Sequence, residues 1–344
     1  MLLIRHIFNK IVSGNKEYQQ IFKDFSYYPD TLSGYAFTRD SIPFIFSGEW
    51  NENQTPFSEY STNAYNNSKF FTELSKRNYN KNFYDFDFTW NSDKSLEFDN
   101  ISYLDTTKKS TLLKQEVKYF LYKALPFPLK QFSKIDTFDL SLAQTTQNQE
   151  PYAWDDISIY DNYLERPLSK TDQNYFQYVH IEGAHVPFNL DSNVKMLAGE
   201  EGTYGDKIEA TIKIIDKYLT RLKDNDAYDN ATIVILADHG YDIDGTNRAN
   251  PILYIKGNSE KHSQTVISKK QISYIDLCEG FIELLDGKSS TEIFKDVPTS
   301  GRVRRFLNNS FNKEEHMQEF EQTGHAWETE NFKPTGRTFD LWFL

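Results

Sequence analysis

The stretch that decides the fold is Thr232-Ile233-Val234-Ile235-Leu236-Ala237-Asp238-His239-Gly240. Its first six residues are apolar on both faces, which is typical of a central strand in a sheet that helices cover on each side. A carboxylate, an imidazole and a glycine follow directly, and glycine lets the backbone turn sharply there. Because ligands of open α/β sheets bind at the carboxyl ends of strands, we expect a polar site at this point.

The flanking sequence extends this pattern into a layered domain. Strands are predicted over 175–181 and 250–256, where β-branched and aromatic residues are frequent. Helices are predicted over 207–223, from the helical spacing of Ile208, Ile212, Ile215, Leu219 and Leu222, and over 274–285. Alternation of strands and helices predicts an α/β fold.

The remaining segments are less regular. Residues 1–24 predict an amphipathic helix, and 41–48 form an apolar segment that ends in a glycine. Residues 50–170 are rich in Asn, Lys, Tyr and Phe with weak periodicity, so their elements and their role stay open. The polar and aromatic stretch from about 300 is expected to pack on the core as a tail.

Composition excludes several classes of protein. The formal net charge of −12 over 344 residues argues against nucleic acid as the main partner, because binders of phosphate backbones carry a basic footprint. Cys278 is the single cysteine, so no internal disulfide forms. No apolar run approaches the ~18 residues of a membrane helix, and the first residues are too short and charged for a signal peptide. The chain as given is therefore expected to be soluble.

Histidines cluster after the predicted strands. His180-Ile181-Glu182-Gly183-Ala184-His185-Val186-Pro187-Phe188 follows the strand over 175–181, and His239 follows the strand over 232–237. Three of the seven histidines thus lie where a site is expected. One interpretation is a pair of imidazoles over a polar pocket. The alternative is one buried and one exposed histidine with ordinary hydrogen bonds.

Two further patterns have both a functional and a local interpretation. Asp238 and His239 suit a zinc or manganese ion, but the same tripeptide alone is also an ordinary turn after a strand. Thr38 precedes the apolar segment, where a hydroxyl at a helix N-terminus near a metal becomes a nucleophile. The alternative is that Thr38 or Ser41 is only a helix N-cap.

Taken in order along the chain, these three segments resemble the sulfatase and phosphoethanolamine or phosphoglycerol transferase branch of the alkaline phosphatase superfamily, which includes lipoteichoic-acid-synthase-like proteins. The resemblance implies a mostly parallel central sheet sandwiched by helices. It implies a catalytic domain over 1–295 and a small C-terminal extension over 296–344 packed on it. Thr38 falls at the nucleophile position, Asp238, His239 and Thr38 at metal-ligand positions, and His180 and His185 in the loop that contacts the phosphoryl group.

The sequence departs from the family pattern in two places. Sulfatases carry Cys or Ser at the nucleophile, with Pro two and Arg four residues later, whereas this chain has Thr38, Asp40 and Ile42. This favours the phosphotransferase branch. The family's first strand ends in an acidic metal ligand, which would lie before Met1, and no Asp or Glu precedes Glu17. The branch's later histidine also has no counterpart between Gly240 and His262.

The resemblance therefore implies a divalent-metal-dependent phosphoryl transferase or hydrolase, with zinc or manganese preferred and calcium or magnesium as alternatives. The partner would be a phosphorylated or sulfated small molecule, lipid or glycan, on the outer face of the cell membrane. The membrane would be reached only through a segment absent from this chain. Two alternatives stay open: a sulfuric ester hydrolase, and a truncated or inactive member that acts as a binding domain.

Overall fold

The computed structural model describes residues 5–84, 98–99, 156–166, 168, 172–197, 202–240, 249–308 and 316–340, and positions 117, 120, 123 and 126. The first four residues, most of 85–155 and residues 241–248 lie outside the described residues, and so do the expectations that fall on them. No helix in the described ranges is long and apolar enough to cross a membrane.

The main sheet has the strand order β5-β6-β1-β7, formed by Ile233–Leu236, Leu253–Lys256, Ser26–Tyr27 and Val266–Ile267. β5 pairs antiparallel with β6, β6 antiparallel with β1, and β1 parallel with β7. Two parallel pairs accompany it: β3 with β4 (Asn80–Tyr84, Tyr175–Val179) and β2 with β8 (Thr31–Leu32, Ile272–Ser273). The α/β prediction is confirmed, but among these described pairs the parallel arrangement holds only in part.

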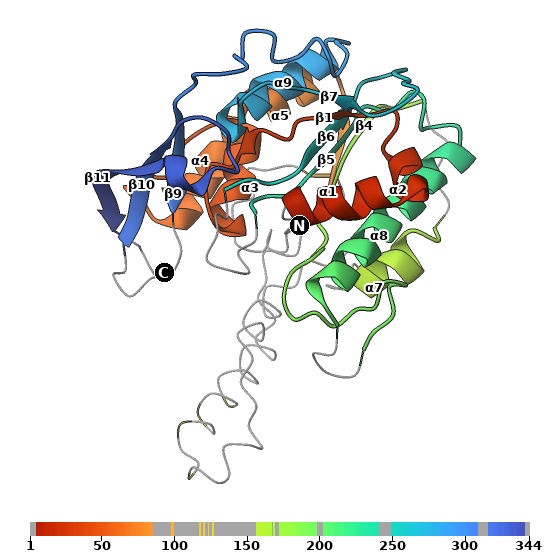
Figure 1. The fold of residues 1–344 in the computed structure, drawn as a ribbon, viewed down its shortest axis with the longest axis horizontal. Coiled ribbons are helices and arrows are strands. Elements are labelled where there is room, and N and C mark those ends of the chain that lie inside the picture. Colours follow the sequence, from red (N-terminus) through yellow and green to blue (C-terminus); the bar gives the residue numbers. More distant parts are fainter. Residues whose placement is uncertain are drawn as a thin grey trace.

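Helices cover both faces of these strands, as Figure 1 shows. One layer contains α1, α2 and α8 (Arg5–Gly14, Lys16–Ile21, Tyr204–Asp224), and α1 contacts α8. The other contains α3, α4, α5 and α9 (Thr38–Ser47, Phe57–Asn66, Lys69–Lys76, Leu277–Leu285). Two short turns, α7 (Asp156–Ser158) and the π-helical η5 (Ile159–Tyr163), lie beside α8. The helices predicted over 207–223 and 274–285 are confirmed, whereas the single helix predicted over 1–24 is divided at Asn15, the N-cap of α2, into α1 and α2.

A separate hydrophobic cluster fills the space on each face of the sheet. The first packs α1, α2 and α8 against it through residues such as Phe8, Phe22 and Ile212. The second packs α3, α5 and α9 through residues such as Phe44, Phe71 and Cys278. Both clusters include buried β6 residues, because alternate side chains of a strand point to opposite faces. β6 therefore lies in the sealed centre of the domain.

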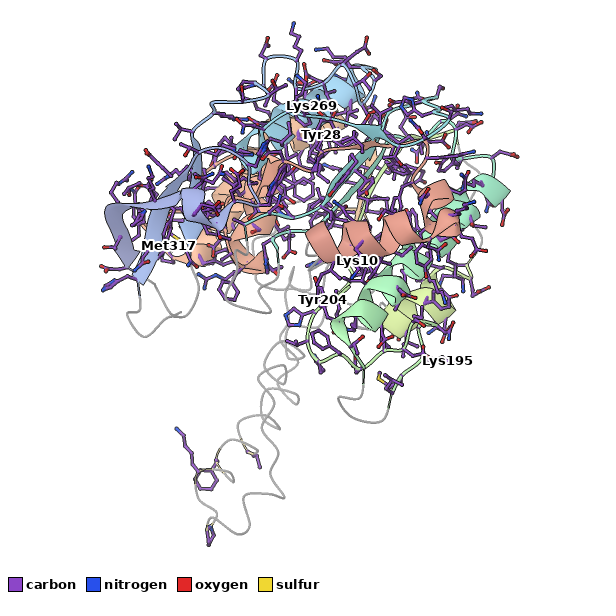
Figure 2. The ribbon with its side chains drawn as sticks, viewed as in Figure 1. Lys10, Tyr28, Lys195, Tyr204, Lys269 and Met317 are labelled. Carbon is purple, nitrogen blue, oxygen red and sulfur yellow. The ribbon has the colours of Figure 1, made fainter. Side chains whose placement is uncertain are left out.

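The C-terminal residues form an antiparallel sheet, β9-β10-β11, over Arg304–Asn308, His316–Gln322 and Phe332–Asp340. It contacts the α/β body through a buried ion pair of 2.9 Å between Arg304 and Asp30, and through the main-chain bond from Leu307 N–H to the Gly34 carbonyl. Met317 of β10 and Lys195 of the loop before α8 lie at opposite ends of the view in Figure 2. The proposed boundary at 295/296 stays a prediction.

Candidate active site

Thr38 is the first residue of helix α3. The preceding Phe37 has extended backbone angles and no side-chain capping bond, so the interpretation of Thr38 or Ser41 as an ordinary N-cap is wrong. The helix is held by its apolar residues, which are buried from Ile42 to Phe46. It ends at Gly48, whose φ of 72° favours glycine. The Thr38 hydroxyl is thereby fixed at the positive end of a ten-residue helix.

Asp238 and His239 meet Thr38 at the end of β5. The Thr38 hydroxyl donates to Asp238 Oδ2 at 2.5 Å and lies 3.5 Å from His239 Nε2. His239 Nε2 is itself 3.4 Å from Asp238 Oδ2. Residues 200 positions apart in the sequence are thus in direct contact. The three predicted site residues therefore meet at one point. Their roles as nucleophile and metal ligands stay predictions.

The Asp238 carboxylate lies in a buried, positively polarised environment. Only 2% of Asp238 and 3% of His239 is exposed. Burial would raise the pKa of the Asp238 carboxyl, but the imidazoles of His239 and His180 and the bond from Thr38 outweigh it. They hold that pKa well below its usual range. The carboxylate therefore stays charged, as a metal ligand or hydrogen-bond acceptor must.

The two histidines of the 180–188 loop have different environments. His180 is buried, and it is near enough to Asp238 to influence the carboxylate electrostatically. His185 is exposed, and its Nδ1 lies against the carbonyl of Val186. Among the described contacts, none joins His185 to Thr38, Asp238 or His239. The structure therefore brings His180 to the cluster and leaves His185 at the solvent side of the loop.

A buried carboxylate, Asp156, holds this loop in place. Its two oxygens accept the backbone N–H groups of Glu182 at 2.9 Å and Gly183 at 3.0 Å. Gly183 has φ 60°, a conformation that glycine adopts without strain. The fully buried Lys207 of α8 reaches Glu182 at 3.4 Å. Burial raises the pKa of Asp156 to about 6, although the charge of Lys207 opposes that rise.

The sequence interpretation did not include Asp156 or Lys207. Asp156 comes from the stretch whose periodicity is weak, so no local signal marks it. Lys207 gives a weak sequence signal, because it lies on the buried face of α8 together with Thr211 and Ile214. A lysine on an apolar stripe indicates a buried partner.

The donor chemistry of the cluster fits a divalent cation. Donors of a tetrahedral zinc site with bonds of 2.0–2.2 Å lie about 3.4 Å apart, and two of the three separations here are 3.4 and 3.5 Å. The third is the hydrogen bond between Thr38 and Asp238. Within the described ranges, no group of three or more His, Cys, Asp or Glu residues is placed to hold a metal. The three donors therefore form an incomplete set.

Comparison with solved structures supports the fold. A protein in the alkaline phosphatase superfamily from Vibrio parahaemolyticus matches with a TM-score of 0.54 and 12% identity, over 96% of this chain and 79% of that one. Ps i-CgsB, solved in complex with k-i-k-neocarrahexaose, matches with a TM-score of 0.51 and 14% identity, over 88% and 75%. No curated protein matches the sequence.

A family model assigns most of the chain. The model described as Sulfatase matches residues 17–276, which include Thr38, the 180–188 loop and the Asp238-His239 pair. The match covers all four strands of the main sheet and helices of both layers, and it ends just before α9. The chain therefore belongs to the sulfatase family.

Proposed function

We propose that this protein is a metal-dependent phosphoryl transferase or hydrolase with Thr38 as its nucleophile. The observation that carries the proposal is the contact of the Thr38 hydroxyl with Asp238 and His239 at the start of α3. A nucleophile needs partners within reach that orient and activate it, and here Asp238 and His239 would do so by holding the cation beside the hydroxyl. Thr38, Asp238 and His239 are the residues that would hold the cation.

The reaction proceeds in two displacements. Thr38 Oγ1 attacks the phosphorus of a phosphodiester, and the bond from phosphorus to the leaving alcohol breaks. The proton of the Thr38 hydroxyl passes to solvent. His185, on the solvent side of the 180–188 loop, would give a proton to the leaving oxygen once the bound substrate extends to that loop. Water or a second alcohol then attacks the phosphothreonine and returns a proton to His185. Thr38 regains its own proton from solvent.

Groups around the cluster would stabilise the negative charge of the phosphoryl group during the reaction. The first N–H groups of α3 have no intrahelical acceptors and would be available to a bound phosphoryl group. His180 is buried within electrostatic reach of Asp238, where its ring N–H can donate to a phosphoryl oxygen. When bound, a divalent cation would act as a Lewis acid and lower the pKa of the Thr38 hydroxyl. Zinc or manganese suits the mixture of oxygen and imidazole donors best, with calcium or magnesium as alternatives.

The substrate class proposed is an envelope lipid head group or a glycan bearing a phosphate ester. The oligosaccharide complex of the structural neighbour Ps i-CgsB supports a sugar-containing substrate. The proposed place of action is the outer face of the cell membrane. An assay on phosphorylated lipids in vesicles and on free phosphorylated glycans would separate the two substrate classes.

The test is turnover of a generic aryl phosphodiester by Thr38→Ala, with zinc or manganese added. Loss of the attacking oxygen is expected to lower kcat/KM by at least about 10³-fold. Thr38→Ser keeps an oxygen in place and should retain measurable activity. Ser41→Ala is the matched control, because Ser41 lies one turn further along α3 and its buried hydroxyl has no partner among the described atoms.

Unchanged turnover in Thr38→Ala would remove Thr38 from the reaction. Mass spectrometry of the wild-type protein quenched during turnover should find the phosphoryl adduct on Thr38 and not on Ser41. Inertness of wild type toward every phosphate ester, together with specific glycan binding, would instead support a binding domain.

Sulfuric ester hydrolysis is the second candidate, favoured by the family match over residues 17–276. Sulfatases use an oxidised Cys or Ser at the nucleophile, and this chain has threonine at that position. We therefore expect turnover of an aryl sulfate to be at least tenfold slower than turnover of the aryl phosphodiester. The reverse order would favour the second candidate.

A further inference from the structure

A cavity of about 1070 Å³ separates strands β4 and β5. Residues of both strands line it along their whole length, from Tyr175 to Ile181 on one side and from Thr232 to Leu236 on the other. His180 and Asp238 lie at one end, so the cavity reaches the candidate site. We call this cavity the slot.

Each of the two strands has a strand neighbour on one edge only, among the strands that the structure describes. β4 pairs with β3, and β5 pairs with β6. The slot occupies the space beside the other edges. The burial of side chains reflects this: all four residues of β5 are apolar yet only half-buried, whereas all four residues of β6 are buried.

Helices close the slot above and below. Ile45, Phe46 and Phe281 of α3 and α9 form one wall. The opposite wall contains Ile215 and Leu219 of α8 with Tyr163 of η5. The slot is thus bounded by two strand edges and by two apolar helical faces. A central strand of an α/β sheet has the same neighbours: a strand at each edge and a helical layer on each face.

The two strands run in the same direction. β4 leads into His180 and β5 into Asp238, and these two side chains interact electrostatically. Asn174 and Ala231, which precede the strands, line the far end of the slot. A segment added between them therefore meets both strands in one orientation over about four or five residues.

We propose that the slot is an acceptor site for a β-strand supplied by a peptide segment of about five apolar residues. This segment would pair with β4 and β5 together and join the β3–β4 pair to the main sheet. Main-chain hydrogen bonds would supply affinity, and the apolar walls would select side chains that are hydrophobic on both faces. The proposal rests on the slot alone and does not depend on the proposed catalytic function.

Backbone chemistry favours a peptide over a lipid chain as the occupant. A strand edge presents N–H and C=O groups at regular spacing, and burying such groups beside a hydrocarbon costs free energy. A second copy of this chain fits poorly. Its exposed strand β11 carries Lys333, Pro334 and Arg337, which are unsuited to apolar walls.

The test uses the full chain and a synthetic peptide of five valine, isoleucine and leucine residues with a solubilising lysine tail. Amide hydrogen exchange is measured over Ile233–Leu236 and, as an internal reference, over Leu253–Lys256. Saturating peptide is expected to slow exchange in β5 by at least about tenfold and to leave β6 unchanged. The same peptide with a central proline should have no effect, because proline removes a ladder hydrogen bond.

Two variants give the matched control. Val234→Lys places a charge on the wall of the slot and should abolish peptide binding. Ile267→Lys adds the same charge to β7, where Ile267 is 67% exposed, and should leave binding intact. Thr38→Ala should also bind the peptide normally, so failure of the catalytic proposal and failure of this one are distinguishable.

Three results would overturn the proposal. The first is equal binding of the proline-containing peptide. The second is strong protection of Ile233–Leu236 in the protein without peptide, which would mean that the slot is already filled. The third is displacement of the peptide by a fatty acid that protects the same amides, since a hydrocarbon would then be the occupant.

Discussion

The two strands β6 and β5 are direct neighbours in one sheet, yet they differ in how completely they are enclosed. Leu253 and Ile255 of β6 are fully buried, and a strand flanks β6 on each side. Leu236 of β5 lies opposite Leu253 in the register and is only half-buried, because the slot replaces the second neighbour. Enclosure in an α/β sheet therefore depends on lateral strands as much as on the helical layers. The candidate site lies at the border between the sealed and the open part.

Truncating one leucine in each strand tests the difference in enclosure between β6 and β5, and it should give the largest effect. Leu253→Ala in sealed β6 should lower the free energy of unfolding by about 2–5 kcal/mol, because a fully buried side chain leaves a cavity. Leu236→Ala on the same face of β5 should cost roughly half as much, since it opens onto space that already exists. Urea unfolding followed by circular dichroism measures both. Equal losses would contradict the comparison.

A buried carboxylate beside the open part gives the second prediction. Burial raises the folded-state pKa of Asp156 from 3.8 to about 6, so the folded protein binds its proton more tightly than the unfolded chain. The stabilisation from this group is complete below pH 3.8 and is lost as pH rises through about 6. The loss amounts to roughly 2–3 kcal/mol at most.

Asp156→Asn should remove this component of the pH dependence. Because Asn cannot ionise, the urea midpoint of the wild type should fall relative to that of the variant as the pH rises from 4 to 7. Asp161→Asn is the control, because Asp161 is exposed in the neighbouring π-helical turn. A difference that stays constant with pH would show that Asp156 acts only as an acceptor for the 180–188 loop.

Enlarging the same two leucines should give the smallest effect. Leu253→Phe overfills sealed β6 and should cost about 1–3 kcal/mol. Leu236→Phe can extend into the slot and should change stability by less than about 0.5 kcal/mol. Thermal unfolding of the two variants measures the contrast. A large loss in Leu236→Phe would mean that the slot is not available to side chains.

The parts of the site that local sequence encodes were predictable. The apolar run from Ile233 to Leu236 ends in Asp238 and His239, and the apolar segment after Thr38 ends in Gly48. Both patterns identify an element and the polar residues at its end. The proximity of Thr38 and Asp238 could be expected only from the rule that ligands bind at strand ends. That rule predicts which side chains lie near one another but not their distances.

The remainder depends on partners far apart in the chain. β5 and β6 pair antiparallel, but their apolar patterns are the same in either orientation, so the sequence does not specify the direction. The role of Asp156 comes from two backbone amides 26 and 27 residues away, which periodicity cannot reveal. The slot is a space between residues, so no residue pattern marks it.

The single cysteine gives the protein a native reporter of its own opening. Cys278 lies in α9 within the cluster that packs α3 and α5 against the sheet, and burial raises the pKa of its thiol. A thiol reagent can label it only when that layer detaches, because the thiolate must form and be reached. The rate of labelling would thus measure the rate of local opening of this helical layer in the wild-type chain, without an introduced probe.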